Sequence, residues 1–278
     1  MGGAGGVTGL AEWNAWRARR EEKLRRPHGT LALTGTYWLE DEPAPIVPGE
    51  PVLWSGDGAT VTVTAKAEHG LFLDGMPIDG TVTLYPDTAP HPSTVTVPDG
   101  DLLLEPIERD GVPALRVYDP NAETRRTFAG IDVFDYAPDA VVEAVFTPYP
   151  AERTERVLNA DGAYRGLGLV GEVEFSLTAV DSLAAPDPSG GRYTLAVERN
   201  ADGSLQAVIA DATSGVSTYR FRFLKIPAPD ADGRTAVDFN RAYLPPCAFA
   251  DHYVCPVPPR GNTLPFPVEA GEKAVRRG

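Results

Sequence analysis

The sequence has few of the residues that build disulfide frameworks and metal clusters. It holds two cysteines and four histidines among 278 residues. Proteins that depend on several disulfides carry many more cysteines in far shorter chains, so a disulfide framework is excluded. No C-x-x-C pair occurs, and neither does the G-x-x-x-x-G-K-[ST] loop that cradles phosphates. We therefore expect no metal and no organic cofactor.

Basic charge is also scarce. Lysine and arginine total 25 against 39 aspartates and glutamates, a net charge of -14. A protein that reads nucleic acid or an anionic membrane surface needs clustered basic residues, so we expect neither partner. No apolar run approaches the roughly 20 residues needed to cross a bilayer, and the N-terminus lacks the pattern of a signal peptide. We expect a soluble, cytoplasmic protein.

One helix is predicted, over residues 8–26. Apolar residues recur there at spacings of three and four, and Trp13 and Trp16 lie on the same face. Thr8 is a suitable N-cap, and Pro27 ends the helix. We expect the two tryptophans to pack this helix on the body of the protein. The alternative is a helix that binds a partner.

Beyond the helix, the apolar pattern changes to a period of two, which is typical of strands. The alternating stretches are 60–65, 81–85, 93–97, 114–119, 140–146, 171–180, 193–199, 205–211 and 217–226. Turn sequences such as NADG, found twice, separate them and favour hairpins. No second strongly helical stretch appears, so a parallel sheet with helical crossovers is not expected. We predict a mainly β fold, an antiparallel β-sandwich or partly closed barrel with one N-terminal α-helix.

The composition marks no domain boundary. Residues 1–7 are rich in glycine, and we expect them to be disordered. We expect residues 8–278 to form a single β-rich domain, since such domains are common at this length. The alternative is two apposed β halves that divide near residue 150.

Residues 238–259, DFNRAYLPPCAFADHYVCPVPP, differ from the rest of the chain because they hold both cysteines. Cys247, His252 and Cys255 could bind zinc, but a structural site would need a fourth ligand. The cysteines could instead form a disulfide, or remain two buried thiols. A nucleophilic Cys247 assisted by His252 is the fourth interpretation. The missing fourth ligand counts against zinc, and the nucleophile has less support because no known cysteine-protease signature is present. The residues alone do not choose between a disulfide and two buried thiols.

Polar residues in the same segment predict a pocket floor or an ion-pair network. Read as a strand, DFNRAY places Asp238 and Asn240 on one face. If they point inward they need partners, because unpaired buried polar groups are costly. The candidate partners are Arg125, Arg126 and Lys273. A satisfied network that pins the strand and a polar floor that orients a ligand are both open.

Four stretches carry a family resemblance: LTGTYWL (33–39), RRTFAGIDVFDYAPDAVVEAVFTPY (125–149), DATSGVSTYRFRFL (211–224) and VDFNRAYLPPCAFADHYVCPVPPRGNTLPFPVEAGEK (237–273). They resemble the DUF1684 family in order and across most of residues 10–273. The resemblance implies a β-rich, soluble protein of a kind common in actinobacteria, and it implies no mechanism. The chain departs from the family pattern at His252, where members often carry tyrosine.

Two functions follow from these observations. The first is a small-molecule-binding β-barrel, with the option of an enzyme that uses acid–base chemistry on an organic substrate. The second is a non-enzymatic structural or interaction module whose C-terminal motif locks the fold. Whether the chain is an enzyme, its catalytic residues and its oligomeric state stay open. The candidate ligand-binding residues are Arg125, Asp238, Asn240, Tyr243, Cys247, His252, Cys255, Glu272 and Lys273.

Overall fold

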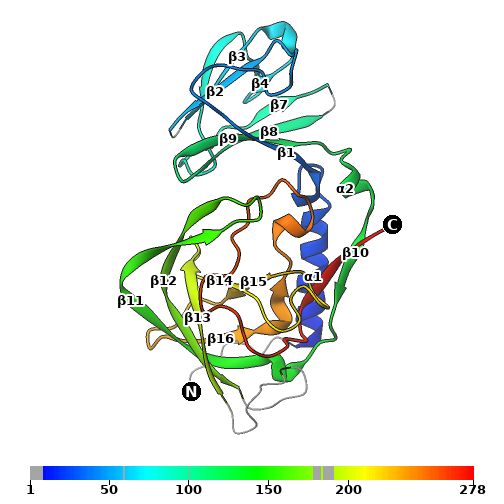
Figure 1. The fold of residues 1–278 in the computed structure, drawn as a ribbon. Helices are drawn as coiled ribbons and strands as arrows, with labels where there is room; N and C mark the ends of the chain where they lie inside the picture. The colour runs from blue at the N-terminus through cyan, green and yellow to red at the C-terminus, as the bar shows by residue number, and fades with distance from the viewer. Residues whose placement is uncertain (1–8, 59, 100, 178–182, 184–190) are drawn as a thin grey trace. The chain divides into compact units, whose positions relative to one another are not determined.

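A computed structural model describes residues 9–58, 60–99, 101–177, 183 and 191–278 (Figure 1). The fold is mainly β with a helix near the N-terminus, and the paired strands of its sheets run antiparallel. This confirms the predicted fold class. Within the described ranges, no helix is long and apolar enough to cross a membrane. Residues 1–7, Thr8 and 178–180 lie outside the described residues, so the disorder, the N-cap and the end of the strand predicted there stay predictions.

The chain divides into two compact units. Unit 1 comprises the described residues of Met1–Glu21, Ala129–Ala248 and Val254–Gly278. Unit 2 comprises Glu22–Phe128 and Phe249–Tyr253. The main boundary between the two units falls between residues 128 and 129. Whether the chain forms one domain or two stays a prediction.

The N-terminal helix α1 (Leu10–Leu24) lies inside the predicted range of 8–26. Trp13 is buried, with 4% of its surface exposed, and its indole Nε1 donates a 2.9 Å hydrogen bond to the carbonyl oxygen of Asn240. Its ring lies 5.7 Å from that of Tyr136. Trp16 is only half-buried. The start of the helix therefore packs on unit 1 mainly through Trp13.

Unit 1 is built on a seven-stranded sheet in the order β16-β11-β12-β13-β14-β15-β17, with a separate pair, β10 and β18. The strands are β10 (Phe128–Val133), β11 (Val141–Leu158), β12 (Tyr164–Leu177), β13 (Gly191–Arg199), β14 (Leu205–Ile209), β15 (Arg222–Ile226), β16 (Arg234–Asp238), β17 (Ala242–Tyr243) and β18 (Glu272–Arg277). Figure 1 shows β11 and β12 as long, curved strands. One face of the sheet carries the main hydrophobic cluster, which includes Val173, Leu195 and Leu224.

A short connection of the chain links the two edge strands of this sheet. Edge strand β16 and edge strand β17 are joined by the three-residue 3-10 helix η4 (Phe239–Arg241). A flat sheet of seven strands would place its edges several strand spacings apart, and three residues cannot span that distance. The sheet therefore curves around its hydrophobic cluster, so that its two edge strands lie near each other.

The predicted hairpin turns are present where the sequence placed them. Both NADG turns end in a glycine with positive φ, 87° at Gly162 and 80° at Gly203. They connect β11 to β12 and β13 to β14. Gly233, with φ of 79°, ends the turn between β15 and β16, but these strands are not neighbours in the sheet, so this turn does not close a hairpin. A left-handed backbone conformation is cheap for glycine, which is why these turns follow from the sequence.

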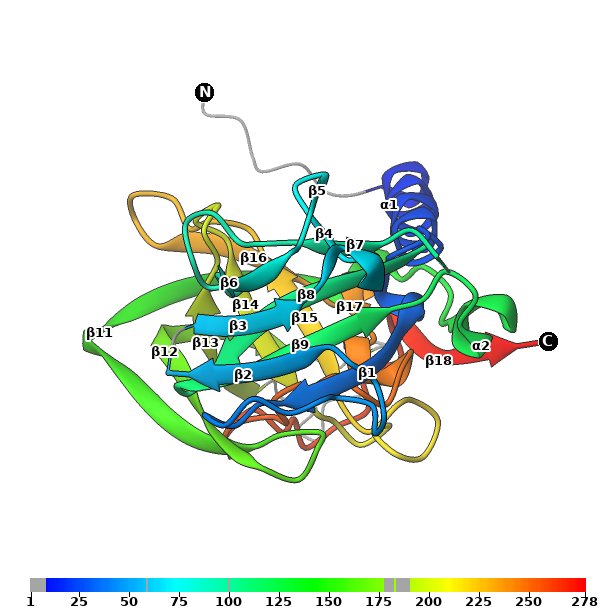
Figure 2. The ribbon, with the colours of Figure 1, turned by 90° about the horizontal axis from the view of Figure 1, so that it is seen from above.

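Unit 2 contains two antiparallel sheets, in the orders β1-β9-β8-β7-β4-β5 and β2-β3-β6 (Figure 2). The strands are β1 (Leu33–Trp38), β2 (Leu53–Asp57), β3 (Thr60–Ala65), β4 (Phe72–Leu73), β5 (Met76–Pro77), β6 (Gly80–Leu84), β7 (Val95–Val97), β8 (Leu102–Arg109) and β9 (Val112–Tyr118). Their inward side chains share one hydrophobic cluster, with Trp54 and Val63 from one sheet and Leu104 and Leu115 from the other. This arrangement is a small β-sandwich.

Candidate functional site

Asp238 and Asn240 do not lie on one strand. β16 ends at Asp238, and Phe239–Arg241 form η4, so the strand predicted for DFNRAY is wrong at this point. The Asp238 Oδ1 accepts hydrogen bonds from the Asn240 backbone N–H at 3.0 Å and its side-chain amide at 3.1 Å. These local bonds favour a turn over a continued strand. Asp238 also forms an ion pair with Arg241 at 3.3 Å.

The fully buried Asn240 connects η4 to the chain just before the 3-10 helix η3 (Pro138–Ala140), which leads into β11. Its side-chain amide donates to the carbonyl oxygen of Ala137 and its Oδ1 accepts from the Ala137 N–H, both at 2.8 Å. The partners expected from the sequence were Arg125, Arg126 and Lys273. The observed polar contacts of Asp238 and Asn240 instead include their own loop and the backbone of residue 137. This is the arrangement of a network that holds the fold.

Glu272 is buried, at 2% exposure, and fully engaged. Its carboxylate is paired with the guanidinium of Arg20, with one contact at 3.0 Å, and accepts a 2.7 Å hydrogen bond from the N–H of Leu244. Arg20 also stacks over the ring of Tyr243, 4.6 Å from its centre. A buried carboxylate with a bidentate partner is a structural tie between β18, α1 and the chain after β17.

Asp211 and Arg222 form a completely buried ion pair that the sequence analysis did not identify. Their contact measures 2.8 Å, and neither side chain is exposed. Arg222 also donates to the carbonyl oxygens of Val268 and Ala270, which holds the segment before β18. Both residues belong to the stretch 211–224 that carries the family resemblance. An arginine within an apolar strand was the signal that could have revealed the pair.

Three polar side chains lie together on the face of the sheet opposite to the hydrophobic cluster. Glu198 on β13 is directly opposite Gln206 on β14, so their side chains share a face. The Tyr243 hydroxyl donates a 3.0 Å hydrogen bond to the Gln206 Oε1. We call Glu198, Gln206 and Tyr243 the glutamate–tyrosine cluster. Tyr243 was predicted as a site residue, whereas Glu198 and Gln206 were not, since alternation makes them ordinary exposed strand residues.

Glu198 is the unusual member of the glutamate–tyrosine cluster. It is largely enclosed, and in the part of the chain that the structure describes its carboxyl has neither a hydrogen bond nor an ion pair. Burial without compensation raises the pKa of Glu198 to about 7. Burial also raises the pKa of Tyr243 to about 12, so the phenol stays protonated. The site thus combines a carboxyl of raised pKa with a phenol that stays protonated.

Both cysteines are buried in unit 1, and neither forms a disulfide. Cys247 lies on the 3-10 helix η5 (Pro246–Ala248), and its backbone N–H donates a 3.3 Å hydrogen bond to the Cys255 sulfur. Cys255 is also close enough to Tyr243 for its charge to raise the pKa of that phenol. Among the described residues, no three His, Cys, Asp or Glu side chains gather in a way that could hold a metal ion.

The remaining predicted residues have separate surroundings. Arg125 belongs to unit 2 and lies on the short helix α2 (Glu123–Arg126), where it donates to the carbonyl oxygens of Arg25 and Pro120. His252, also in unit 2, is exposed, and its carbonyl oxygen accepts a 2.8 Å hydrogen bond from Thr36. The Lys273 amine lies 4.7 Å from the centre of the Phe134 ring in unit 1. The combined pocket of nine residues stays a prediction.

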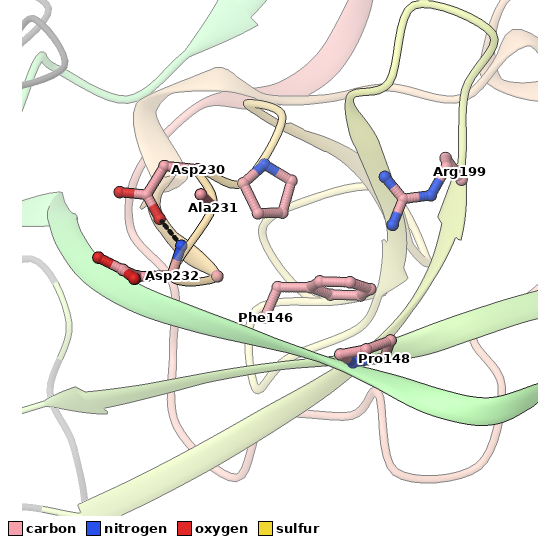
Figure 3. A pocket seen from close by; sticks show the side chains of 8 residues that line it. Phe146, Pro148, Arg199, Asp230, Ala231 and Asp232 are labelled. Carbon is pink, nitrogen blue, oxygen red and sulfur yellow. Dashed lines mark hydrogen bonds between the residues drawn. The ribbon is translucent and has the colours of Figure 1, made fainter.

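An open pocket of about 450 Å³ lies elsewhere in unit 1, between β11, the end of β13 and the turn before β16 (Figure 3). Phe146 forms its floor, with the Arg199 guanidinium 5.2 Å from the ring centre. Asp230 closes the turn by accepting hydrogen bonds from the N–H groups of Asp232 and Arg234. None of the nine predicted residues lines this pocket.

Comparison with known proteins identifies a family match that begins at residue 126. The family described as "Protein of unknown function (DUF1684)" matches residues 126–273. The stretch 33–39 therefore lies outside the matched range. No curated protein matches the chain. Among solved structures, an uncharacterized protein of Haloarcula marismortui, determined by NMR, is 30% identical over 52% of this chain and 77% of its own, with a TM-score of 0.41.

Proposed function

The chain belongs to the DUF1684 family, and from that premise we propose that unit 1 binds a small, carbonyl-bearing organic molecule and exchanges a proton with it through Glu198. The observation that best supports this is the enclosed Glu198 carboxyl, which has no polar partner in the described chain. Buried polar groups are almost always paired, so an unpaired carboxyl calls for an explanation. Carboxyls with a raised pKa are typical of sites that move protons.

Gln206 and Tyr243 supply the recognition. The Tyr243 hydroxyl donates to the Gln206 Oε1, which leaves the Gln206 amide N–H groups available to an acceptor on a ligand. A carbonyl oxygen is such an acceptor. With a pKa of about 7, Glu198 is present in both protonation states near neutral pH, so it can take a proton from the carbon beside that carbonyl and return it.

A non-enzymatic module locked by its C-terminal motif is the second candidate, and a specific observation favours it. Asp238, Asn240 and Glu272 are buried, and each has its polar atoms engaged by neighbouring groups. These contacts explain the polar residues of the motif through folding alone. They leave Glu198 unexplained, which is why proton exchange is the first candidate.

The test combines binding with proton exchange. Purified full-length protein would be screened by thermal shift against small ketones, aldehydes, esters and amides. Compounds that raise the melting temperature would then be followed by NMR in D₂O for exchange of the hydrogens beside the carbonyl. We expect at least one carbonyl compound to bind and to exchange faster than in buffer, and Glu198→Gln to bind it while losing the exchange.

Glu143→Gln is the matched control, because Glu143 is an exposed glutamate on another strand of the same sheet. It should retain both binding and exchange. If no carbonyl compound binds, or if Glu198→Gln exchanges hydrogens as fast as the wild type, the proton-exchange function is wrong and the locking module remains.

A further inference from the structure

The two thiols of unit 1 are held against each other by their surroundings. The Cys247 backbone N–H donates a 3.3 Å hydrogen bond to the Cys255 sulfur. Each cysteine is 6% exposed. The chain between them, 249–253, is assigned to unit 2.

Two further donors are directed at Cys247. The hydroxyl of Tyr219 lies 3.6 Å from the Cys247 sulfur and 3.1 Å from its carbonyl oxygen. The exposed Arg220 next to Tyr219 is close enough for its positive charge to act on the Cys247 thiol. We call Cys247, Cys255, Tyr219 and Arg220 the dithiol cluster.

The electrostatic effect of the dithiol cluster is to favour a thiolate. The hydrogen bond from Cys255 is the largest influence on Cys247 and lowers the pKa of its thiol to about 7, with help from Tyr219 and Arg220. Burial raises the pKa of Tyr219 to about 12, so its hydroxyl keeps the proton that it donates. A thiolate beside a cation is the usual setting of a reactive cysteine, whereas structural cysteines in apolar surroundings are inert.

We propose that Cys247 and Cys255 form a redox-active dithiol that reduces hydroperoxides. The Cys247 thiolate attacks the terminal oxygen of a hydroperoxide ROOH, so that an S–O bond forms and the O–O bond breaks. The proton released by the thiol passes to the leaving alkoxide or hydroxide, which gives the sulfenic acid of Cys247 and ROH. The Cys255 thiol then attacks that sulfur, and a disulfide forms as water departs. In sum, two thiols are oxidised and one hydroperoxide is reduced.

The substrate class follows from access and charge. The thiols are almost covered, so only a small oxidant reaches them. Tyr219 and Arg220 present hydrogen-bond donors where the departing oxygen gains negative charge. The same positive charge repels a metal cation, so the surroundings suit anionic sulfur better than zinc. This inference is independent of the function proposed for Glu198.

The test uses hydrogen peroxide and the reduced full-length protein. Thiols would be counted in denaturant before and after treatment, and the rate would be compared with that of glutathione at pH 7. A thiol with a pKa of about 7 is half ionised there, whereas an ordinary thiol with a pKa of about 8.5 is ionised to a few per cent. Because a more acidic thiolate is also a weaker nucleophile, oxidation should be faster by a factor of roughly three to five. Both thiols should disappear together, and intact mass should show a monomer that has lost two hydrogens.

Variants assign the roles of the two cysteines. In Cys255→Ser, dimedone should trap a sulfenic acid on Cys247, and Cys247→Ser should give no adduct. Tyr219→Phe should slow oxidation several-fold, while Tyr164→Phe, at an exposed tyrosine of the same unit, should not. Oxidation of the wild type no faster than glutathione, a disulfide between two chains, or dimedone labelling of Cys255 in Cys247→Ser would overturn the proposal.

Discussion

Replacing Glu198 with glutamine is expected to stabilise unit 1, and increasingly so as the pH rises. Burial raises the pKa of this carboxyl from its ordinary value of 4.5 to about 7 in the folded protein. The folded state therefore holds the proton more tightly than the unfolded state between these two values. By linkage, the wild type loses stability as the pH rises through this window, and the loss is complete above the folded pKa.

The size of the effect follows from the pKa difference. A shift of one pKa unit corresponds to about 1.4 kcal/mol, so ionisation of Glu198 in the folded state costs at most about 3 kcal/mol. Residual exposure of the side chain reduces this figure, which makes it an upper bound. Glutamine has a similar shape and carries no charge at any pH. The variant should match the wild type near pH 4.5 and exceed it by up to about 3 kcal/mol at pH 8.

Urea unfolding followed by far-UV circular dichroism, at intervals from pH 4.5 to pH 8, measures this difference. If two transitions appear, the one shifted by the Trp13→Ala substitution belongs to unit 1 and is the one to compare. Glu143→Gln is the control, because an exposed carboxylate should give no such pH-dependent gain. A difference between Glu198→Gln and the wild type that stays constant from pH 4.5 to pH 8 would refute the reasoning.

Four further substitutions test the packing of unit 1, each by chemical denaturation. Trp13→Ala should lower the free energy of unfolding by roughly 3–5 kcal/mol, because the ring is buried and hydrogen-bonded. Trp16 is only half-buried, so Trp16→Ala should lower it clearly less. Equal losses would contradict the assignment of Trp13 as the main contact. Arg222→Met should cost roughly 3–5 kcal/mol, since it leaves Asp211 buried without its cation, and an unchanged stability would show that the pair is dispensable. Gly171→Ala should lower the free energy of unfolding by roughly 1–3 kcal/mol, because the added methyl group would meet the backbone of β11 and the ring of Phe146. A variant as stable as the wild type would mean that strands β11 and β12 shift freely to make room.

Local pattern was sufficient for the secondary structure of most of the chain. The period of two predicted β3, β9, β13 and β14, and the period of three to four predicted α1. Both patterns work because a side chain's direction follows from the backbone geometry of its own element. The Asp-Gly turns were predictable for the same reason, since a positive φ is a property of the residue itself.

Partners across the fold were decided by tertiary structure. Alternation gives the face on which Glu198 lies, but the packing around β13 and β14 decides that this face is enclosed and that no cation reaches the carboxyl. The chain at 238–241 continues an alternating pattern, yet hydrogen bonds from Asn240 to Asp238 and to the distant Ala137 turn it into η4. Periodicity records which way a side chain points from its own backbone. Whether that side chain then meets water, an opposite charge or a thiol depends on segments far away in sequence. Tyr219 and Cys247 are an example, because only the folded chain brings them together.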